Sequence, residues 1–243
     1  TTQNALGILA LAQRLDVPVV TGATHPLDGR AALADNAFGS SGMGKVQLPA
    51  PQVAALPTDA QTWLAQTIAA HDAHSITLIS IASLTDLARL LEQTPDSAQR
   101  LKQILVMGGC TQDLPCVDGV RRGNITREAE FNFQQDPVAA ARVFALIEKL
   151  NIRTVVFPME VTHCLLATPA VCAEARAAIG GALGTMVADL LWVSEPLDRA
   201  KFGVNGAFIH DAITVAWLLQ PELLTGMPAH IEIDQNSGAS RAT

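Results

Sequence analysis

The sequence predicts a single α/β domain with a doubly wound, mostly parallel sheet that helices cover on both faces. Two observations favour this class. Helical patterns alternate with short apolar runs along the whole chain, and 243 residues are enough to bury a substantial core. Apolar residues make up 49% of the chain and charged residues 16%, which is typical of a globular protein and not of a disordered one.

The first half of the chain alternates as such a sheet requires. Residues 4–14 are expected to form a helix, and 17–22 (VPVVTG) a strand that ends in glycine. A connection rich in proline and glycine, 25–55, is too long to be idle in a compact domain. The next expected elements are a helix at about 59–71, a strand at 76–82, a helix near 84–93 and a strand at 103–107.

The second half resumes the alternation after an irregular stretch, 110–135. The helix expected at 137–150 begins behind Asp136-Pro137, in which Asp caps the helix and Pro occupies its first turn. The remaining expected elements are a strand at 153–158, helices near 168–178 and 181–193, and a last helix from Asp211 to about Leu219.

Composition and charge exclude several classes of protein. The formal net charge of −7 argues against a nucleic-acid-binding surface, because that would need clustered lysine and arginine. No run of 18 apolar residues exists, so we expect neither a membrane span nor a signal peptide. The four cysteines form no CxxC pair and no zinc-ligand pattern with histidine, so we expect reduced thiols and a cytoplasmic location.

Ligands of doubly wound sheets bind beyond the carboxyl ends of the strands. The densest polar cluster in such a position is Gly123-Asn124-Ile125-Thr126, followed by Glu130-Phe131-Asn132. In an extended segment Glu130 and Asn132 would share a face, and a carboxylate beside an amide could bind the vicinal hydroxyls of a ribose. The alternative is a polar loop in which Asn124 makes an Asx turn and Glu130 is solvated.

Two other features could carry chemistry. Asp211 is a possible oxygen ligand for a cation, with His210 beside it as an acid or hydrogen-bond donor. The alternative is that Asp211 only caps the last helix and His210 is a packed loop residue. Met107 precedes Gly108-Gly109, which allow a tight turn and a close approach of the backbone to a sugar.

Further motifs occur in a single order along the chain. They are Gly22-Ala23 with Pro26-Leu27, Gly39–Gly44, Ser83–Leu87, Ile104–Gly109, Gly123–Thr126, Ala129–Asn132 with Asp136-Pro137, Val161–His163 and His210-Asp211. Together they resemble the inosine-uridine-preferring nucleoside N-ribohydrolases over essentially the whole chain. The AEFN block followed by the HD pair is the most specific part of this resemblance.

The resemblance implies roles for several residues. Asn124, Glu130 and Asn132 would hold the ribose, with Met107 packed against the sugar. Asp211 and the backbone carbonyl of Ile81 would bind Ca²⁺, and His210 would lie near the leaving base. The implied reaction is hydrolysis of the N-glycosidic bond of a ribonucleoside by a water that Ca²⁺ orients, through an oxocarbenium-like state. The implied protein is a homo-oligomer, a dimer or a tetramer.

The sequence departs from the family at both ends. The family's aspartate motif, DxDxxxDD, does not occur, and neither does the GN dipeptide that the resemblance would place before Thr1. The chain begins Thr1-Thr2-Gln3 without a methionine. Residues 231–234 have the pattern of the start of a closing strand. We therefore expect 1–243 to be an incomplete nucleoside hydrolase domain that is itself inactive. A non-catalytic nucleoside- or ribose-binding protein without a metal centre is the alternative.

Recognition of the base stays open in the sequence. Phe38 stands before Gly39 where the family often has histidine, and the chain contains no tyrosine. Trp192 and Phe202 could stack on the base or could be core aromatics. His163 follows a strand in a supporting position, and we expect it to lie outside the active site. Purine and pyrimidine nucleosides both remain candidate substrates.

Overall fold

The computed structural model describes residues 1–30, 38–39, 41–235 and 242. Its largest sheet is parallel and has the order β1 (Thr77–Ser80), β2 (Gln103–Met107), β5 (Thr154–Phe157). Thr77 pairs with Gln103 across the first ladder, and Ile104 with Thr154 across the second. The expected parallel sheet is thus confirmed for three strands. Among the described strands their order runs in one direction, without the reversal that defines a doubly wound sheet.

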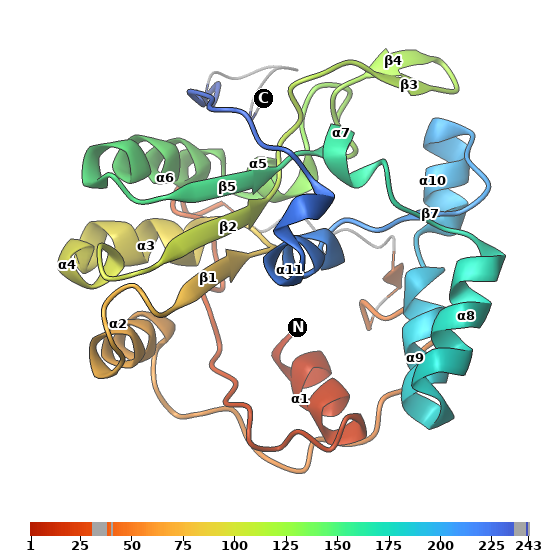
Figure 1. Ribbon diagram of the computed structural model, residues 1–243, viewed down its shortest axis with the longest axis horizontal. Helices are drawn as coiled ribbons and strands as arrows, with labels where there is room; N and C mark the ends of the chain where they lie inside the picture. Colours follow the sequence, from red (N-terminus) through yellow and green to blue (C-terminus); the bar gives the residue numbers. More distant parts are fainter. Residues whose placement is uncertain (31–37, 40, 236–241, 243) are drawn as a thin grey trace.

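Helices cover both faces of this sheet, as the sequence predicts (Figure 1). All five residues of β2 are buried, and they alternate between two cores. Ile104 and Val106 pack in a cluster with α2 (Ala60–Ala70), α3 (Thr85–Gln93) and α6 (Pro137–Leu150). Leu105 packs on the opposite face against Phe157 and α11 (Ala212–Leu219). This two-sided burial explains why β2 is a continuous apolar run in the sequence.

Outside this core, α8 (Pro169–Ile179), α9 (Gly181–Leu191) and α10 (Glu195–Phe202) form a group on the right of Figure 1, away from the sheet. The other elements are α1 (Thr2–Leu11), α4 (Pro95–Ala98), β3 (Leu114–Cys116), β4 (Gly119–Arg121), α5 (Phe131–Gln135), α7 (Met159–Thr162), β6 (Leu166–Ala167), β7 (Ala207–Phe208) and η2 (Pro221–Leu223). No helix of the described chain is long and apolar enough to cross a membrane. All four cysteines are free thiols.

Two predicted strands are absent from the structure, so these predictions are wrong. Residues 17–22 and 231–234 belong to no sheet. A strand needs a neighbour for its backbone groups, and within the described residues neither segment has one. Val19 instead accepts a single bond from the amide of Leu56, at 2.8 Å. Ile231 and Ile233 pack their side chains against the cluster on the α6 face without a strand partner.

The stretch predicted to be irregular, 110–135, contains regular structure. The hairpin β3–β4 closes through Val117-Asp118, with Gly119 at a φ of +119°. The dipeptide Asp118-Gly119 is a hairpin signal that could have predicted this turn. Helix α5 follows, and its N-cap is Glu130, an uncommon capping residue that conceals the start of the helix in the sequence.

The cap of α6 connects three distant segments. Asp136 is fully buried and accepts hydrogen bonds from the Ala139 amide at 3.0 Å, the Leu27 amide at 2.7 Å and the Thr85 hydroxyl at 2.7 Å. A buried carboxylate is tolerated when hydrogen-bond donors of this kind replace water. The predicted cap is therefore confirmed, and it also ties the loop before residue 30 and the start of α3 to α6.

We expect Asp136→Ala to lower the free energy of unfolding by about 3 kcal/mol or more, since three buried donors lose their acceptor. Asp59→Ala is the matched control, because Asp59 also caps a helix through the Thr62 amide but is exposed; we expect about 1 kcal/mol there. Urea denaturation of the three proteins measures both values. Equal losses would show that the burial of Asp136 contributes nothing.

Candidate functional site

The carboxyl ends of β2 and β5 lie side by side and form the base of the candidate site. Met107 pairs with Phe157, and past the strands the Met159 amide donates to the carbonyl of Gly109 at 2.9 Å. The two glycines after Met107 are required by packing. A Cβ on Gly108 would lie 2.4 Å from the Phe133 ring, and one on Gly109, whose φ is +76°, would lie 2.7 Å from it. Glycine here therefore lets α5 pack directly on the end of β2.

Glu130 joins these two segments through its carboxylate. Its Oε2 accepts from the amides of Gly109 at 2.9 Å and Phe133 at 3.1 Å, and its Oε1 from the amide of Asn132 at 2.9 Å. The side chain is 2% exposed, so the interpretation of Glu130 as a solvated loop residue is wrong. Burial, and to a lesser degree the charge of Asp211, raises the pKa of Glu130 to about 7.

Asn132 lies on α5 and not in an extended segment, so the expected face shared with Glu130 does not form. Its Nδ2 donates to the Met107 carbonyl at 3.0 Å and contacts the Met107 sulfur at 3.3 Å. Among the described residues its Oδ1 has no hydrogen-bond partner, which leaves that atom as an acceptor for a ligand hydroxyl. The structure thus brings Met107, Glu130 and Asn132 together at one strand end.

Asn124 lies at the start of the same helix. Its Oδ1 accepts from the Phe131 amide at 2.8 Å, seven residues along the chain, so the contact is not an Asx turn. Lys201 of α10 donates to the Asn124 carbonyl at 2.6 Å. Because Oδ1 is occupied by the backbone, the amide Nδ2 is the group that Asn124 can offer to a ligand.

His210 approaches the site from the end of β7. Its Nδ1 lies 2.7 Å from the hydroxyl oxygen of Thr162, at the end of α7. Burial lowers the pKa of His210 to about 4. The ring of His210 lies 5.6 Å from that of His163, which stacks on Phe208 with a centroid distance of 3.7 Å and meets Phe202 edge-on at 4.7 Å. We call His163, Phe202 and Phe208 the aromatic cluster.

The aromatic cluster contains two residues that the sequence analysis singled out, His163 and Phe202. His163 lies beside His210, and its buried Nε2 has no partner in the described chain; its expected place outside the active site stays a prediction. Phe202 packs with His163 and Phe208, and the Arg121 guanidinium lies 5.8 Å from its ring centre. Sequence reasoning missed Thr162 and Phe208. The position of Thr162, directly before His163 and after a strand, was the signal that could have identified it.

Asp211 and Ile81 are the residues expected to bind calcium. Asp211 begins α11, but its side chain makes no capping bond, which disfavours its interpretation as a cap alone. Part of the residue is open to solvent, yet desolvation of the carboxyl group raises the pKa of Asp211 to about 6. Ile81 follows β1 and is 44% exposed. Across the described ranges, no three His, Cys, Asp or Glu side chains gather as a metal site.

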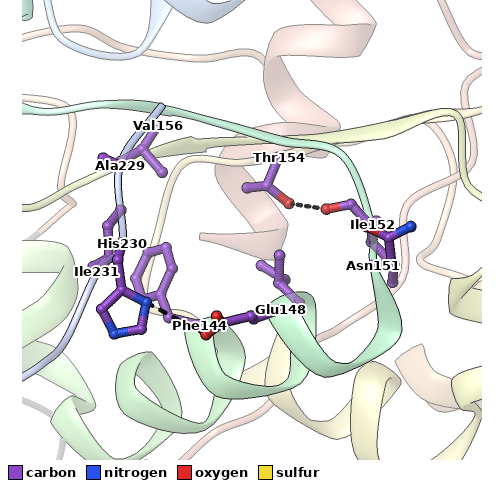
Figure 2. A pocket seen from close by; sticks show the side chains of 10 residues that line it. Phe144, Glu148, Asn151, Ile152, Thr154, Val156, Ala229, His230 and Ile231 are labelled. Atoms are coloured by element: carbon purple, nitrogen blue, oxygen red, sulfur yellow. Dashed lines mark hydrogen bonds and ion pairs between the residues drawn. The ribbon is translucent and has the colours of Figure 1, made fainter. Parts of the chain in front are cut away.

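A separate pocket lies at the opposite end of the sheet. Figure 2 shows this pocket, of about 310 Å³, between α6, the start of β5 and the segment 229–231. Its rim carries His230 and Glu148, which lie 3.4 Å apart and are both exposed. We place the functional site at Met107 and Glu130 instead, because ligands of parallel sheets bind at the carboxyl ends of the strands. Ser40, in the Gly39–Gly44 motif, and residues 31–37, in the connection expected at 25–55, lie outside the described residues.

These features describe an α/β protein with a cluster of polar groups, the candidate site, at the carboxyl edge of its parallel sheet. The sequence profile of the inosine-uridine preferring nucleoside hydrolases matches residues 1–243. A pyrimidine-specific ribonucleoside hydrolase of Salmonella typhimurium, RihA, is 35% identical over 235 residues, which cover 96% of this chain and 71% of that protein. The chain therefore belongs to the inosine-uridine preferring nucleoside hydrolase family, whose members are N-glycosidases.

Solved structures support the same fold. A plant nucleoside hydrolase superposes with a TM-score of 0.85 at 24% identity, covering 99% of this chain and 71% of that one. A purine-preferring ribonucleoside hydrolase of Gardnerella vaginalis gives a TM-score of 0.84 at 22% identity, with coverages of 99% and 73%. At these identities the likeness concerns the fold alone.

The raised pKa of Glu130 predicts a pH-dependent stability. The folded protein holds this proton more tightly than the unfolded chain, so the contribution is present below the usual pKa of 4.5 and is lost as pH rises through about 7. The loss amounts to roughly 3 kcal/mol. Glu130→Gln cannot ionise, so we expect its free energy of unfolding to vary less than that of the wild type between pH 4.5 and 7.5.

Urea titrations at several pH values measure this difference, and the exposed Glu174→Gln is the control. We expect Glu130→Gln to be less stable than the wild type at pH 4.5, because its amide NH₂ faces one backbone donor. The difference in the free energy of unfolding between the two proteins should narrow as the pH rises. A difference in the free energy of unfolding that stays constant between pH 4.5 and 7.5 would contradict the account.

Proposed function

We propose that this protein hydrolyses the N-glycosidic bond of ribonucleosides, releasing ribose and the free base. The observation that supports this most is the convergence of two groups of residues at one sheet edge. Glu130 and Asn132 lie at the end of β2, and the charge of Asp211 is close enough to raise the pKa of Glu130. Family membership supplies the class of reaction, and these residues supply a site for the sugar.

In this proposal α5 and the end of β2 form a floor for the ribose. The Oδ1 of Asn132 and the Nδ2 of Asn124 offer one acceptor and one donor to sugar hydroxyls, and Met107 supplies an apolar surface. Cleavage of the C1′–N bond passes through an oxocarbenium-like state with positive charge on the ring. Acceptors held rigidly by the backbone stabilise that charge without reorganising as it develops.

The leaving base would lie beside His210 and the aromatic cluster. The ring of His210 is near enough to the cluster to serve a base that stacks there, and Phe202 offers the stacking surface. A base leaves as an anion unless it gains a proton, so a donor at this position speeds departure. Uridine, cytidine, inosine and adenosine, assayed side by side, determine which base the protein prefers.

This family binds calcium, but the described residues supply too few oxygen ligands to hold the ion by themselves. We propose that Asp211 and the carbonyl of Ile81 contribute two oxygens, whereas Ca²⁺ prefers six to eight. The described chain holds no cluster that supplies the remainder. We also propose that the protein forms a homodimer or homotetramer, which sedimentation velocity tests directly.

The shortage of ligands predicts weak metal binding. We expect the 243-residue chain to bind Ca²⁺ no more tightly than about 1 mM and to release no base from inosine or uridine. Isothermal titration calorimetry and a base-release assay measure the two properties, with Asp211→Asn as the control for any weak signal. Tight binding of one Ca²⁺ per chain would overturn this prediction.

The proposed sugar floor is tested in the product of the complete open reading frame that encodes these residues. Asn132→Ala should reduce kcat/KM by about 100-fold or more, because it removes an acceptor used in the transition state. Gln66→Ala, on the exposed face of α2, is the control and should change kcat/KM by less than about twofold.

Near-normal kinetics of a folded Asn132→Ala variant would refute the proposed sugar floor. The competing hypothesis is a nucleoside- or ribose-binding protein without catalysis. Saturable ribose binding without base release by the complete product would support that hypothesis.

A further inference from the structure

The contact between Thr162 and His210 determines how the histidine can act. Thr162 is completely buried, so its hydroxyl must find its partners within the protein. It lies 2.7 Å from the Nδ1 of His210 and 3.2 Å from the carbonyl oxygen of Met159, one turn earlier in α7. The hydroxyl has a single proton for these two contacts.

The single proton of the Thr162 hydroxyl can point to either partner, and only one of these two arrangements makes both contacts hydrogen bonds. If the hydroxyl donates to Nδ1, its contact with the Met159 carbonyl brings together two oxygens without a proton between them. If it donates to the Met159 carbonyl, it can accept a proton from Nδ1–H of His210, and both contacts become hydrogen bonds. The Met159 carbonyl also accepts from the His163 amide at 2.8 Å, and its two lone pairs accommodate both donors.

We propose that Thr162 is a positioning residue that keeps a proton on the Nδ1 of His210. The arrangement is the same for the neutral and the charged ring, because both carry the Nδ1 proton. Nε2, on the far side of the ring from Thr162, is then the nitrogen that faces a ligand. It accepts in the neutral ring; after taking up a proton from solvent it can give that proton to the departing base, which returns the ring to the neutral Nδ1–H form. Resting on the proposed function, this inference assigns the contact with the departing base to Nε2.

The surroundings hold the ring in this orientation. The ring of His163 lies 5.6 Å from that of His210 at an angle of 50°, and Phe208 lies 6.3 Å from it at 51°. His163 is itself fixed by its parallel stack on Phe208. A flip of the His210 ring would put a carbon atom in the place of Nδ1–H next to the buried Thr162 hydroxyl. The hydroxyl oxygen would then lose the donor from which it accepts, with no water to replace it.

Nuclear magnetic resonance of the histidine nitrogens tests the proposal on the 243-residue chain. In a long-range ¹H–¹⁵N spectrum at neutral pH, we expect the Nδ1 of His210 to have the shift of a protonated nitrogen and Nε2 that of an unprotonated one. Thr162→Val keeps the shape but removes the acceptor, so the Nδ1 proton should be lost in part or entirely to Nε2. Thr162→Ser should restore the wild-type pattern.

Thr185→Val is the matched control, because the Thr185 hydroxyl also bonds a carbonyl one turn earlier in a helix but lies far from His210 in the sequence and is exposed. It should leave the His210 signals unchanged. A wild-type spectrum with the proton on Nε2, or a Thr162→Val spectrum identical to the wild type, would overturn the proposal. The wild-type spectrum tests the assignment even where a variant does not fold.

Kinetics of the complete open reading frame's product add a second readout. Only the charged ring carries a proton on Nε2 as well as on Nδ1, and the bond from Nδ1–H to Thr162 stabilises that form. Thr162→Val should therefore lower kcat on nucleosides by about 10- to 100-fold and leave p-nitrophenyl riboside, whose phenolate leaves unprotonated, within about threefold. Equal losses on both substrates would overturn the positioning role. If the wild type releases no base while the spectrum shows Nδ1–H, the proposed function fails and the proton assignment stands.

Discussion

The candidate site depends on one buried carboxylate. Glu130 accepts three backbone hydrogen bonds, one from Gly109 at the end of β2 and two from the first turn of α5. Burying a carboxylate is unfavourable unless donors replace water, and the raised pKa of Glu130 shows that the compensation here is partial. The unfavourable burial of the carboxylate also has a structural effect, because the bonds that Glu130 accepts hold Asn132 next to the carbonyl of Met107.

The second half of the site follows from the sheet itself. β5 is the neighbour of β2, so the helix that begins after β5 must start next to Gly109. That helix, α7, presents Thr162 to His210, and β7 delivers His210-Asp211 from a distant part of the sequence. The ends of β2 and β5 meet because parallel strands end at one edge, whereas β7, which pairs antiparallel with β6, brings His210 to that edge from a separate sheet.

Much of this could be predicted from the sequence, and the failures have physical causes. β2 and α6 have their predicted bounds, because β2 is apolar on both faces and Asp136-Pro137 marks the start of α6. The strand at 17–22 fails because its apolar pattern does not reveal whether a neighbouring strand exists. Glu130 and Asn132 were identified as a pair, but their geometry was not, since glutamate rarely caps a helix. Thr162 belonged to a recognised motif, but its contact with His210 could not be predicted because the two residues lie 48 positions apart.

The most direct test of the central claim is to follow three backbone amides as the pH changes. If one carboxylate joins β2 to α5, the amide proton resonances of Gly109, Asn132 and Phe133 should shift together with a common midpoint near pH 7. The Glu130→Gln variant should abolish that shared transition. Three unrelated midpoints, or a shared one near the usual pKa of 4.5, would contradict the account.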